Sequence, residues 1–265
     1  IGNSAFLDCT GFRGNLVIPN SVLEIGKEAF SGCYGFNGTL CLSLELTKID
    51  QSAFCGCYGF TGDLRIPNSV QSLGIYSFYN FYGLNGSLYL SDKTLVIGMK
   101  CFYNCSRLTG SLIFPKYLRN IGSYAFYNCR GFTGNLTIKN STLAIGDGAF
   151  SCCSGFNGSL IFSYNMSKIL DSVFENCSGL TGNLYIPNSV ISIGVNSFSN
   201  CIGFDGQLII PNSVISIGEG AFSHCSKLTG SLIIPNECAS LGEEAFFDCS
   251  SLNGTLSISE NLTSI

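Results

Sequence analysis

The feature that most constrains this chain is a repetition with a period of 24 residues. Phenylalanine recurs without a slip at positions 6, 30, 54, 78, 102, 126, 150, 174, 198, 222 and 246. Columns of glycine, leucine and cysteine follow the same period from Gly14, Leu16 and Cys9 onward, and Phe81 alone interrupts the cysteines. A fixed period of this size is typical of stacked solenoids. We therefore expect residues 1–265 to form one elongated unit of about eleven repeats.

One repeat shows how the chain is expected to run within a unit. Leu184 and Ile186 alternate with Tyr185, which is the period-2 pattern of a short strand, and Pro187 ends it because proline has no N–H for a ladder. The next apolar positions follow at gaps of three, five and three residues, ending at Cys201. This spacing favours a tight return path made of a second short strand or a 3₁₀ turn. A unit of this length has no room for a helix of average length.

The predicted fold class is therefore a repeat solenoid with one short parallel strand per 24-residue repeat and a turn or short-strand return side. A single unit leaves its strand edge and its apolar side chains unsatisfied. Stacking pairs the strands in parallel at a spacing of about 4.8 Å. It also places each phenylalanine at the same depth, so we expect a continuous spine of stacked rings.

The repeat pattern LxGxLxIPxSVxxIGxxAFxxC resembles the treponemal-type leucine-rich repeat of BspA-like proteins. The resemblance covers the whole chain and is carried best by the stretches 184–201 (LYIPNSVISIGVNSFSNC) and 208–225 (LIIPNSVISIGEGAFSHC). It implies a leucine-rich-repeat stack. Members of this family occur in bacteria and parasitic protists, are typically cell-surface or secreted proteins, and are implicated in adhesion to host cells and extracellular matrix.

Some positions depart from that pattern. Common leucine-rich repeats carry an asparagine ladder after the strand, whereas the corresponding column here is mixed, so no such ladder is expected there. Asp50 and Leu170 replace the glycine that follows the isoleucine column, which predicts local irregularity at both places. The chain starts within a repeat and shows no polar capping repeat, so we expect it to be part of a longer protein.

Composition excludes several classes of protein. Hydrophobic residues make up 46% of the chain and charged residues 11%, which is the opposite of a disordered composition. The net charge is −4 and the 13 basic residues are scattered, so no nucleic-acid partner is expected. No apolar run approaches the roughly 18 residues that span a bilayer, which predicts no membrane insertion in this segment. No signal peptide is visible at the start.

The candidate chemical groups have structural explanations. Ten of the 15 cysteines fall in one core column, which favours a ladder of reduced, buried thiols over disulfides or a zinc site. Cys101 and Cys238 fill core columns as well, whereas Cys41 alternates outward. The single histidine, His224, is expected to be solvated. With no catalytic motif in the chain, we expect no enzyme, no cofactor and no metal site.

Two surfaces remain as candidates for function. The outward strand positions form a row on the expected concave face: Val17, Cys41, Arg65, Tyr89, Ile113, Thr137, Ile161, Tyr185, Ile209 and Ile233. Exposed apolar residues often mark interaction sites, although such residues are also good strand formers. The candidate partner-binding residues are Arg65, Tyr89, Ile113, Ile161, Tyr185, Ile209 and Ile233. Nine of the 12 tyrosines also lie between Tyr58 and Tyr127, which indicates either an interface or drift among duplicated repeats.

The sequence therefore supports two functions from different classes. The first is a non-catalytic module that binds protein partners, with the family resemblance implying adhesion at the cell surface or after secretion. The second is an intracellular scaffold that docks on a cytoskeletal or organellar assembly. Ten Asn-x-Ser/Thr sites, including Asn37, Asn85, Asn157 and Asn253, bear on this choice, because glycans on them would favour the first.

Overall fold

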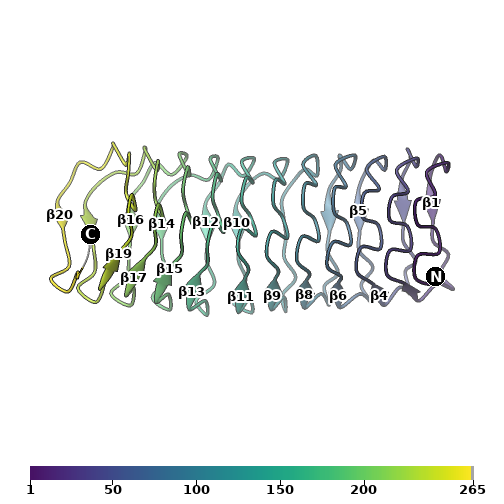
Figure 1. Cartoon of the computed structure of the whole chain (residues 1–265), viewed down its shortest axis with the longest axis horizontal. Helices are drawn as coiled ribbons and strands as arrows, with labels where there is room; N and C mark the ends of the chain where they lie inside the picture. The colour runs from purple at the N-terminus through teal and green to yellow at the C-terminus, as the bar shows by residue number, and fades with distance from the viewer. Residues whose placement is uncertain (264–265) are drawn as a thin grey trace.

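The computed structural model describes residues 1–263, and these form a parallel β-solenoid with about 24 residues per turn (Figure 1). Successive repeats lie side by side from the N-terminal to the C-terminal end of the long axis (Figure 1). Two rows of short strands follow that axis, and no helix occurs in this range. Hence no helix of residues 1–263 could cross a membrane. The predicted repeat solenoid is confirmed.

The first row, called the strand row here, begins at the leucine column. Its members are β1 (Leu16–Val17), β3 (Leu40–Cys41), β5 (Leu64–Arg65), β7 (Leu88–Tyr89), β10 (Leu136–Thr137), β12 (Leu160–Ile161), β14 (Leu184–Tyr185), β16 (Leu208–Ile209), β18 (Leu232–Ile233) and β20 (Leu256–Ser257). Strands pair in parallel with partners 24 residues away, and Leu184 faces Leu208 in register. Residues 112–113 hold the equivalent place without a regular strand.

The second row, called the return row, ends at the isoleucine column. Its members are β2 (Glu24–Ile25), β4 (Lys48–Ile49), β6 (Ser72–Leu73), β8 (Val96–Ile97), β9 (Asn120–Ile121), β11 (Ala144–Ile145), β13 (Lys168–Ile169), β15 (Ser192–Ile193), β17 (Ser216–Ile217) and β19 (Ser240–Leu241). They form a six-stranded and a four-stranded parallel sheet. Ile265, the last member of the isoleucine column, lies outside the described residues.

The return row is interrupted once, between β11 and β13. Leu170 stands directly after β13, where most repeats have glycine. At those glycines a Cβ would approach the backbone of the preceding repeat closely, as at Gly98, where it would lie 2.7 Å from the carbonyl carbon of Gly74. The predicted irregularity is therefore found at Leu170. At Asp50 the expectation is wrong, because the sheet continues through β4 and the Asp50 carboxylate accepts the N–H of Gln51 at 2.7 Å.

The third side of each turn holds the phenylalanine and is a ladder without strand geometry. Two residues that flank each phenylalanine adopt left-handed backbone angles, as Lys100 (φ 51°) and Asn104 (φ 61°) do around Phe102. The N–H groups of these three residues still donate to carbonyls of the next repeat at 2.8–2.9 Å. Within residues 1–263 the return path thus consists of a second strand and stacked turns, with no 3₁₀ helix.

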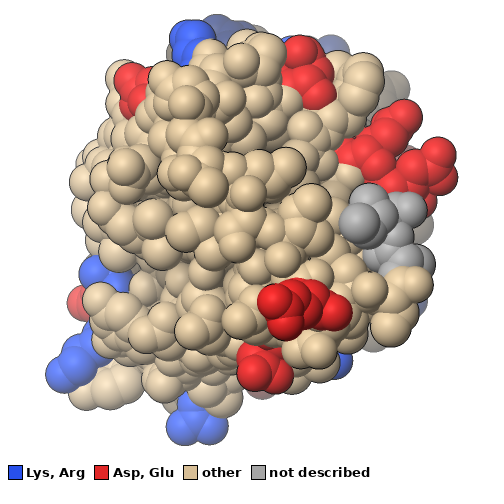
Figure 2. Space-filling model, turned by 90° about the vertical axis from the view of Figure 1, so that its left-hand side faces the viewer, with Lys and Arg blue, Asp and Glu red and all other residues tan. Residues whose placement is uncertain are grey.

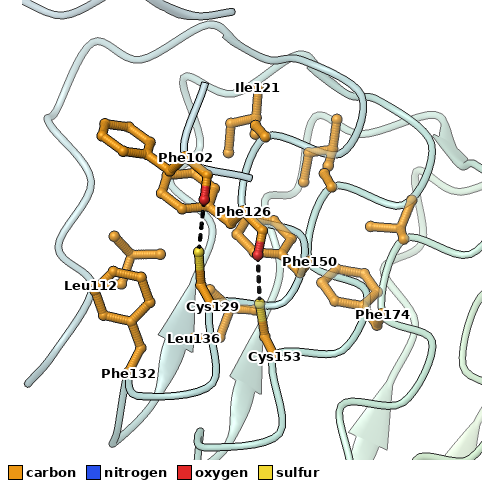
Figure 3. Close-up of a cluster of buried hydrophobic side chains, with 14 of the residues drawn as sticks. Phe102, Leu112, Ile121, Phe126, Cys129, Phe132, Leu136, Phe150, Cys153 and Phe174 are labelled. Carbon is orange, nitrogen blue, oxygen red and sulfur yellow. Dashed lines mark hydrogen bonds between the residues drawn. The ribbon is translucent and has the colours of Figure 1, made fainter. Parts of the chain in front are cut away.

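The phenylalanine rings form the expected spine. Neighbouring rings from Phe6 to Phe246 stack with centroids 5.0–5.8 Å apart and planes within 18° of parallel. The cysteine column runs beside them (Figure 3). Each thiol donates to the carbonyl of a phenylalanine in the preceding repeat, as Cys129 does to Phe102 at 3.1 Å and Cys153 to Phe126 at 3.0 Å. These bonds satisfy buried carbonyls, which explains why cysteine suits this column.

Four repeats replace the proline after the strand row with serine. Ser43, Ser91, Ser163 and Ser259 are buried, and the hydroxyl of each accepts the backbone N–H two residues later at 3.1–3.2 Å. A serine turn of this kind fixes the backbone by a side-chain hydrogen bond where proline fixes it by its ring. Both kinds of repeat therefore turn at the same place.

Candidate interaction surfaces

The strand row presents one side chain per repeat to solvent. In β14 the leucine is buried, whereas Tyr185 is 56% exposed, because successive residues of a strand point to opposite faces. All seven candidate partner-binding residues are exposed on this row: Arg65, Tyr89, Ile113, Ile161, Tyr185, Ile209 and Ile233. The register places neighbours side by side, as with Tyr185 and Ile209. Their role in binding stays a prediction.

The row carries almost no net charge. Its single charged member, Arg65, lies 2.8 Å from the carboxylate of Asp63, and its guanidinium carbon is 3.8 Å from the centre of the Tyr89 ring. A salt bridge and a cation–π contact therefore hold the guanidinium along the surface. Charged side chains are also sparse at the C-terminal end of the stack, where uncharged residues fill most of the view (Figure 2). A partner on this row would be recognised by shape and apolar contact.

Three hollows lie between the strand row and the turn that follows it. The largest, about 660 Å³, is lined by Cys41, Arg65 and Tyr89 on one side and by Leu44 on the other. Two more, of about 380 and 420 Å³, lie beside Ile113 and beside Ile161 with Tyr185. Sequence reasoning missed these hollows because their walls come from different repeats. They give the exposed row a relief that side chains of a partner could fill.

A second exposed apolar row runs beside the return row. Leu23, Leu143, Ile191 and Ile215 lie two residues before the buried isoleucine column and are between 41% and 59% exposed. This row was not singled out from the sequence. The alternation of Ile191 with the buried Ile193 was the signal that could have found it. The molecule thus has two apolar rows, which must be distinguished experimentally.

The tyrosines form two short stacks rather than one patch. Tyr79, Tyr103 and Tyr127 stack as expected, with centroids 4.9 and 4.6 Å apart, and the Lys100 ammonium lies 5.6–5.7 Å from the rings of Tyr76, Tyr103 and Tyr124. A separate stack is formed by Tyr34, Tyr58 and Tyr82 at 5.2 and 5.1 Å. Because the ring faces cover one another, these stacks offer mainly ring edges to solvent.

The cysteines are free, and most are withdrawn from chemistry. Cys101 and Cys238 are fully buried as expected, and Cys41 is exposed. Burial raises the pKa of the Cys201 thiol to about 12, and it raises the pKa of Cys225 as well. Such thiols stay protonated at neutral pH and are poor nucleophiles and metal ligands. Within residues 1–263 no group of three or more His, Cys, Asp or Glu side chains could hold a metal ion.

His224 is half-exposed, in agreement with the sequence, but it has a partner. Its Nδ1 lies 3.1 Å from a carboxylate oxygen of Asp248, which occupies the same column one repeat later, and its ring meets the edge of Phe247. The pair is an exposed contact between repeats. Nothing nucleophilic stands beside it to make a catalytic group.

Comparison with known proteins agrees with this architecture. A family model described as a BspA type leucine rich repeat region (6 copies) matches residues 1–86, 81–205 and 179–265, which together span the chain. No curated protein sequence gives a significant match.

Solved structures of bacterial leucine-rich repeat proteins are similar. One from Bacteroides ovatus ATCC 8483 is 25% identical with a TM-score of 0.54, over 96% of this chain and 81% of that one. The leucine-rich repeat protein of T. pallidum is 26% identical with a TM-score of 0.52, over 59% and 70%. One from Eubacterium ventriosum ATCC 27560 shares the fold at 14% identity and a TM-score of 0.52, over 100% and 82%. Repeats of this family and fold are typically non-catalytic protein-interaction modules. The chain belongs to the BspA-type leucine-rich repeat family.

Proposed function

We propose that this chain is the ligand-binding part of a secreted or cell-surface protein and that its strand row adheres to a host or matrix protein. The observation that carries the proposal is the exposed row of isoleucine and tyrosine side chains, from Tyr89 to Ile233, bordered by three hollows. Contiguous apolar residues on a protein surface often mark a site of interaction. A partner that contacts many repeats at once gains affinity from a large, shape-complementary area without any chemical step.

The test replaces two neighbouring side chains of the strand row. Tyr185→Asp with Ile209→Asp puts two carboxylates side by side in β14 and β16, where a partner would have to desolvate them. We expect binding to immobilised extracellular-matrix extract and to host cells to fall at least tenfold. Circular dichroism and the thermal midpoint are expected to stay unchanged, because both side chains are exposed.

The matched control uses the other apolar row in the same repeats. Ile191→Asp with Ile215→Asp introduces the same charges at residues that are 41% and 50% exposed beside β15 and β17. We expect this variant to bind as the unmodified chain does. Equal loss in both double variants, or full binding by the strand-row variant, would contradict the assignment. Failure of the unmodified chain to bind either material would contradict adhesion itself.

One observation favours a second candidate, an intracellular scaffold. All 15 cysteines are free, and nine column thiols donate to phenylalanine carbonyls, which requires the reduced form. Reduced cysteines are the rule in the cytosol. Fractionation of the source cells distinguishes the two candidates, because the scaffold would remain with the cytosolic assemblies and the adhesin would be labelled on intact cells by an impermeant reagent.

A further inference from the structure

We infer that the Asn-Gly turns before the strand row form a glycan-bearing edge, with N-linked oligosaccharides on Asn37, Asn85, Asn157 and Asn253. This inference rests on the secreted location proposed above. Ten Asn-x-Ser/Thr sites occur in the chain, and they alone do not say which could carry a sugar in the folded protein. The structure separates them by what each side-chain amide does.

The four turn asparagines are held in one orientation by their oxygen. The Oδ1 atom of Asn37 accepts the N–H of Gly14 at 2.8 Å, and the N–H of Gly38 donates to the carbonyl of Gly14 at 3.0 Å. The same pair of bonds recurs at the other three sites, with Oδ1 distances of 2.8–3.2 Å. All four side chains are exposed, and no group of residues 1–263 accepts a hydrogen bond from their Nδ2 atoms. The amide nitrogen, which carries an N-linked sugar, therefore remains free.

The chain supplies its own evidence that the fold does not need this nitrogen. Asp205 occupies the same column, and its carboxylate accepts the N–H of Gly182 at 2.9 Å just as an asparagine oxygen does. The N–H of Gly206 likewise donates to the carbonyl of Gly182 at 3.2 Å. Because an aspartate fits without an amide nitrogen, a substituent on Nδ2 disturbs no contact on which the turn depends.

The spacing of the sites suits bulky groups. Each of these turns follows a repeat whose glycine has left-handed backbone angles, such as Gly14 (φ 78°) and Gly62 (φ 83°), and that glycine offers the N–H to the asparagine. Turns of this kind therefore never occupy adjacent repeats. The nearest two sites, Asn37 and Asn85, are two repeats apart, which is about 10 Å at the spacing of parallel strands.

Other sites are closed to such a group. The amide nitrogen of Asn104 donates to Asn80 at 3.1 Å, and its oxygen accepts from Asn128 at 2.6 Å, so both ends of the amide are enclosed in a partly buried ladder. The amide nitrogen of Asn176 donates to the carboxylate of Glu175 at 3.3 Å in a partly buried position. A sugar on either nitrogen would displace its neighbours.

The modification is a glycosyl transfer from a lipid-linked oligosaccharide diphosphate. The Nδ2 atom forms a bond to the anomeric carbon and loses a proton, while the bond from that carbon to the phosphate oxygen breaks and the lipid diphosphate leaves with the electron pair. The sugars would stand three residues before the strand row. They would confine a partner to the opposite margin, where the hollows lie.

The test is glycopeptide mapping of the whole chain secreted from a glycosylating eukaryotic cell line and purified as folded monomer. We expect glycans on Asn37, Asn85, Asn157 and Asn253, and unmodified Asn104 and Asn176. A glycan on Asn104 in folded material, or four bare turn asparagines, would overturn the inference. Because mapping involves no partner, and binding can be measured with unglycosylated protein, failure here is distinguishable from failure of the adhesion proposal.

A designed site gives the sharper arm. Asp205→Asn with Gln207→Ser places Asn-Gly-Ser on the same turn, as at Asn157, and we expect one additional glycan. Asp205→Asn alone is the matched control, because it keeps the turn but lacks the hydroxyl residue and should gain none. Converting the four asparagines to aspartate should remove all four glycans while the yield of folded monomer is retained, as Asp205 predicts. Absence of a glycan from the designed site would show that the turn itself does not accept one.

Discussion

Phe150 joins two neighbouring repeats through three interactions at once. Its ring stacks on Phe126 at 5.5 Å and on Phe174 at 5.8 Å. Its N–H donates to the carbonyl of Val173 at 2.9 Å, and its own carbonyl accepts the thiol of Cys177 at 3.1 Å. The side chain is fully buried. At the scale of a residue, stability therefore comes from side chains that act across the boundary between repeats.

Phe150→Ala should reduce the free energy of unfolding by about 3–5 kcal/mol, because it removes a large buried ring and leaves a cavity between two stacked rings. Equilibrium denaturation with urea, followed by circular dichroism, measures the change. Tyr164→Ala serves as the comparison, since Tyr164 is 74% exposed, and its cost should stay within about 0.5 kcal/mol. A loss for Phe150→Ala as small as that of Tyr164→Ala would mean that the spine does not hold the stack together.

The strands illustrate how little regular structure each element needs. Every strand is two residues long, yet the return row forms sheets of six and four strands because each repeat adds one more in register. The glycine after the isoleucine column permits this close approach. The N–H of Gly98 donates to the carbonyl of Leu73 at 3.0 Å, and the backbone of Gly74 and Ile75 lies where a Cβ would be. At the scale of an element, a missing side chain sets the spacing.

Gly98→Ala should destabilise the fold by about 1–3 kcal/mol, because the new Cβ would lie 2.7 Å from backbone atoms that cannot rotate away. Thermal unfolding and urea denaturation measure the loss. Gly11→Ala is the matched control: no atom lies within 4 Å of its added Cβ, so it should be neutral or slightly stabilising. Similar losses for the two variants would argue against close approach as the reason for the glycine column.

The molecule as a whole is a one-dimensional stack whose interior column of thiols runs from end to end. Only four ion pairs join side chains of residues 1–263, and all of them are at least a third exposed. Exposed pairs contribute little to stability. The main titratable groups buried by folding are the cysteines, whose pKa values are raised by burial, as for Cys177, Cys201 and Cys225. The dependence of stability on pH should therefore be governed by this column.

Stability is expected to be full below pH 9 and to fall between pH 9 and pH 12. Below pH 9 the Cys201 thiol is protonated in both states; above it the unfolded chain releases the proton, whereas the folded chain holds it up to about pH 12. Each such thiol costs about 1.4 kcal/mol per pH unit in that window. Between pH 8 and pH 10, Cys201→Ala should therefore lose about 1.4 kcal/mol less than the unmodified chain, as measured by urea denaturation with reductant present. Identical losses would show that this thiol ionises equally in both states.

Much of the fold could be predicted because it is written at a fixed interval. The outward position of Tyr185 followed from alternation along a strand, and the stacking of Phe150 on its neighbours followed from equal spacing. The expectation at Asp50 failed because a glycine column indicates close approach without saying whether one carboxylate can be accommodated by a local hydrogen bond. Leu23 and Ile191 were overlooked because the return strand is too short to show alternation over more than two residues.

The sequence by itself determined the number of residues per turn, the core columns and the exposed row on the strands. When similar units stack, every position of a column meets nearly the same environment, so the residue type at that position reports its burial. Only the tertiary structure decided which atoms of different repeats meet. The bond from the Cys177 thiol to the Phe150 carbonyl, the seat of the Asn37 amide on Gly14 and the hollow beside Tyr185 all depend on the rise and twist between repeats. A pattern of residue types carries no record of that rise and twist, because they result from the packing of all columns together.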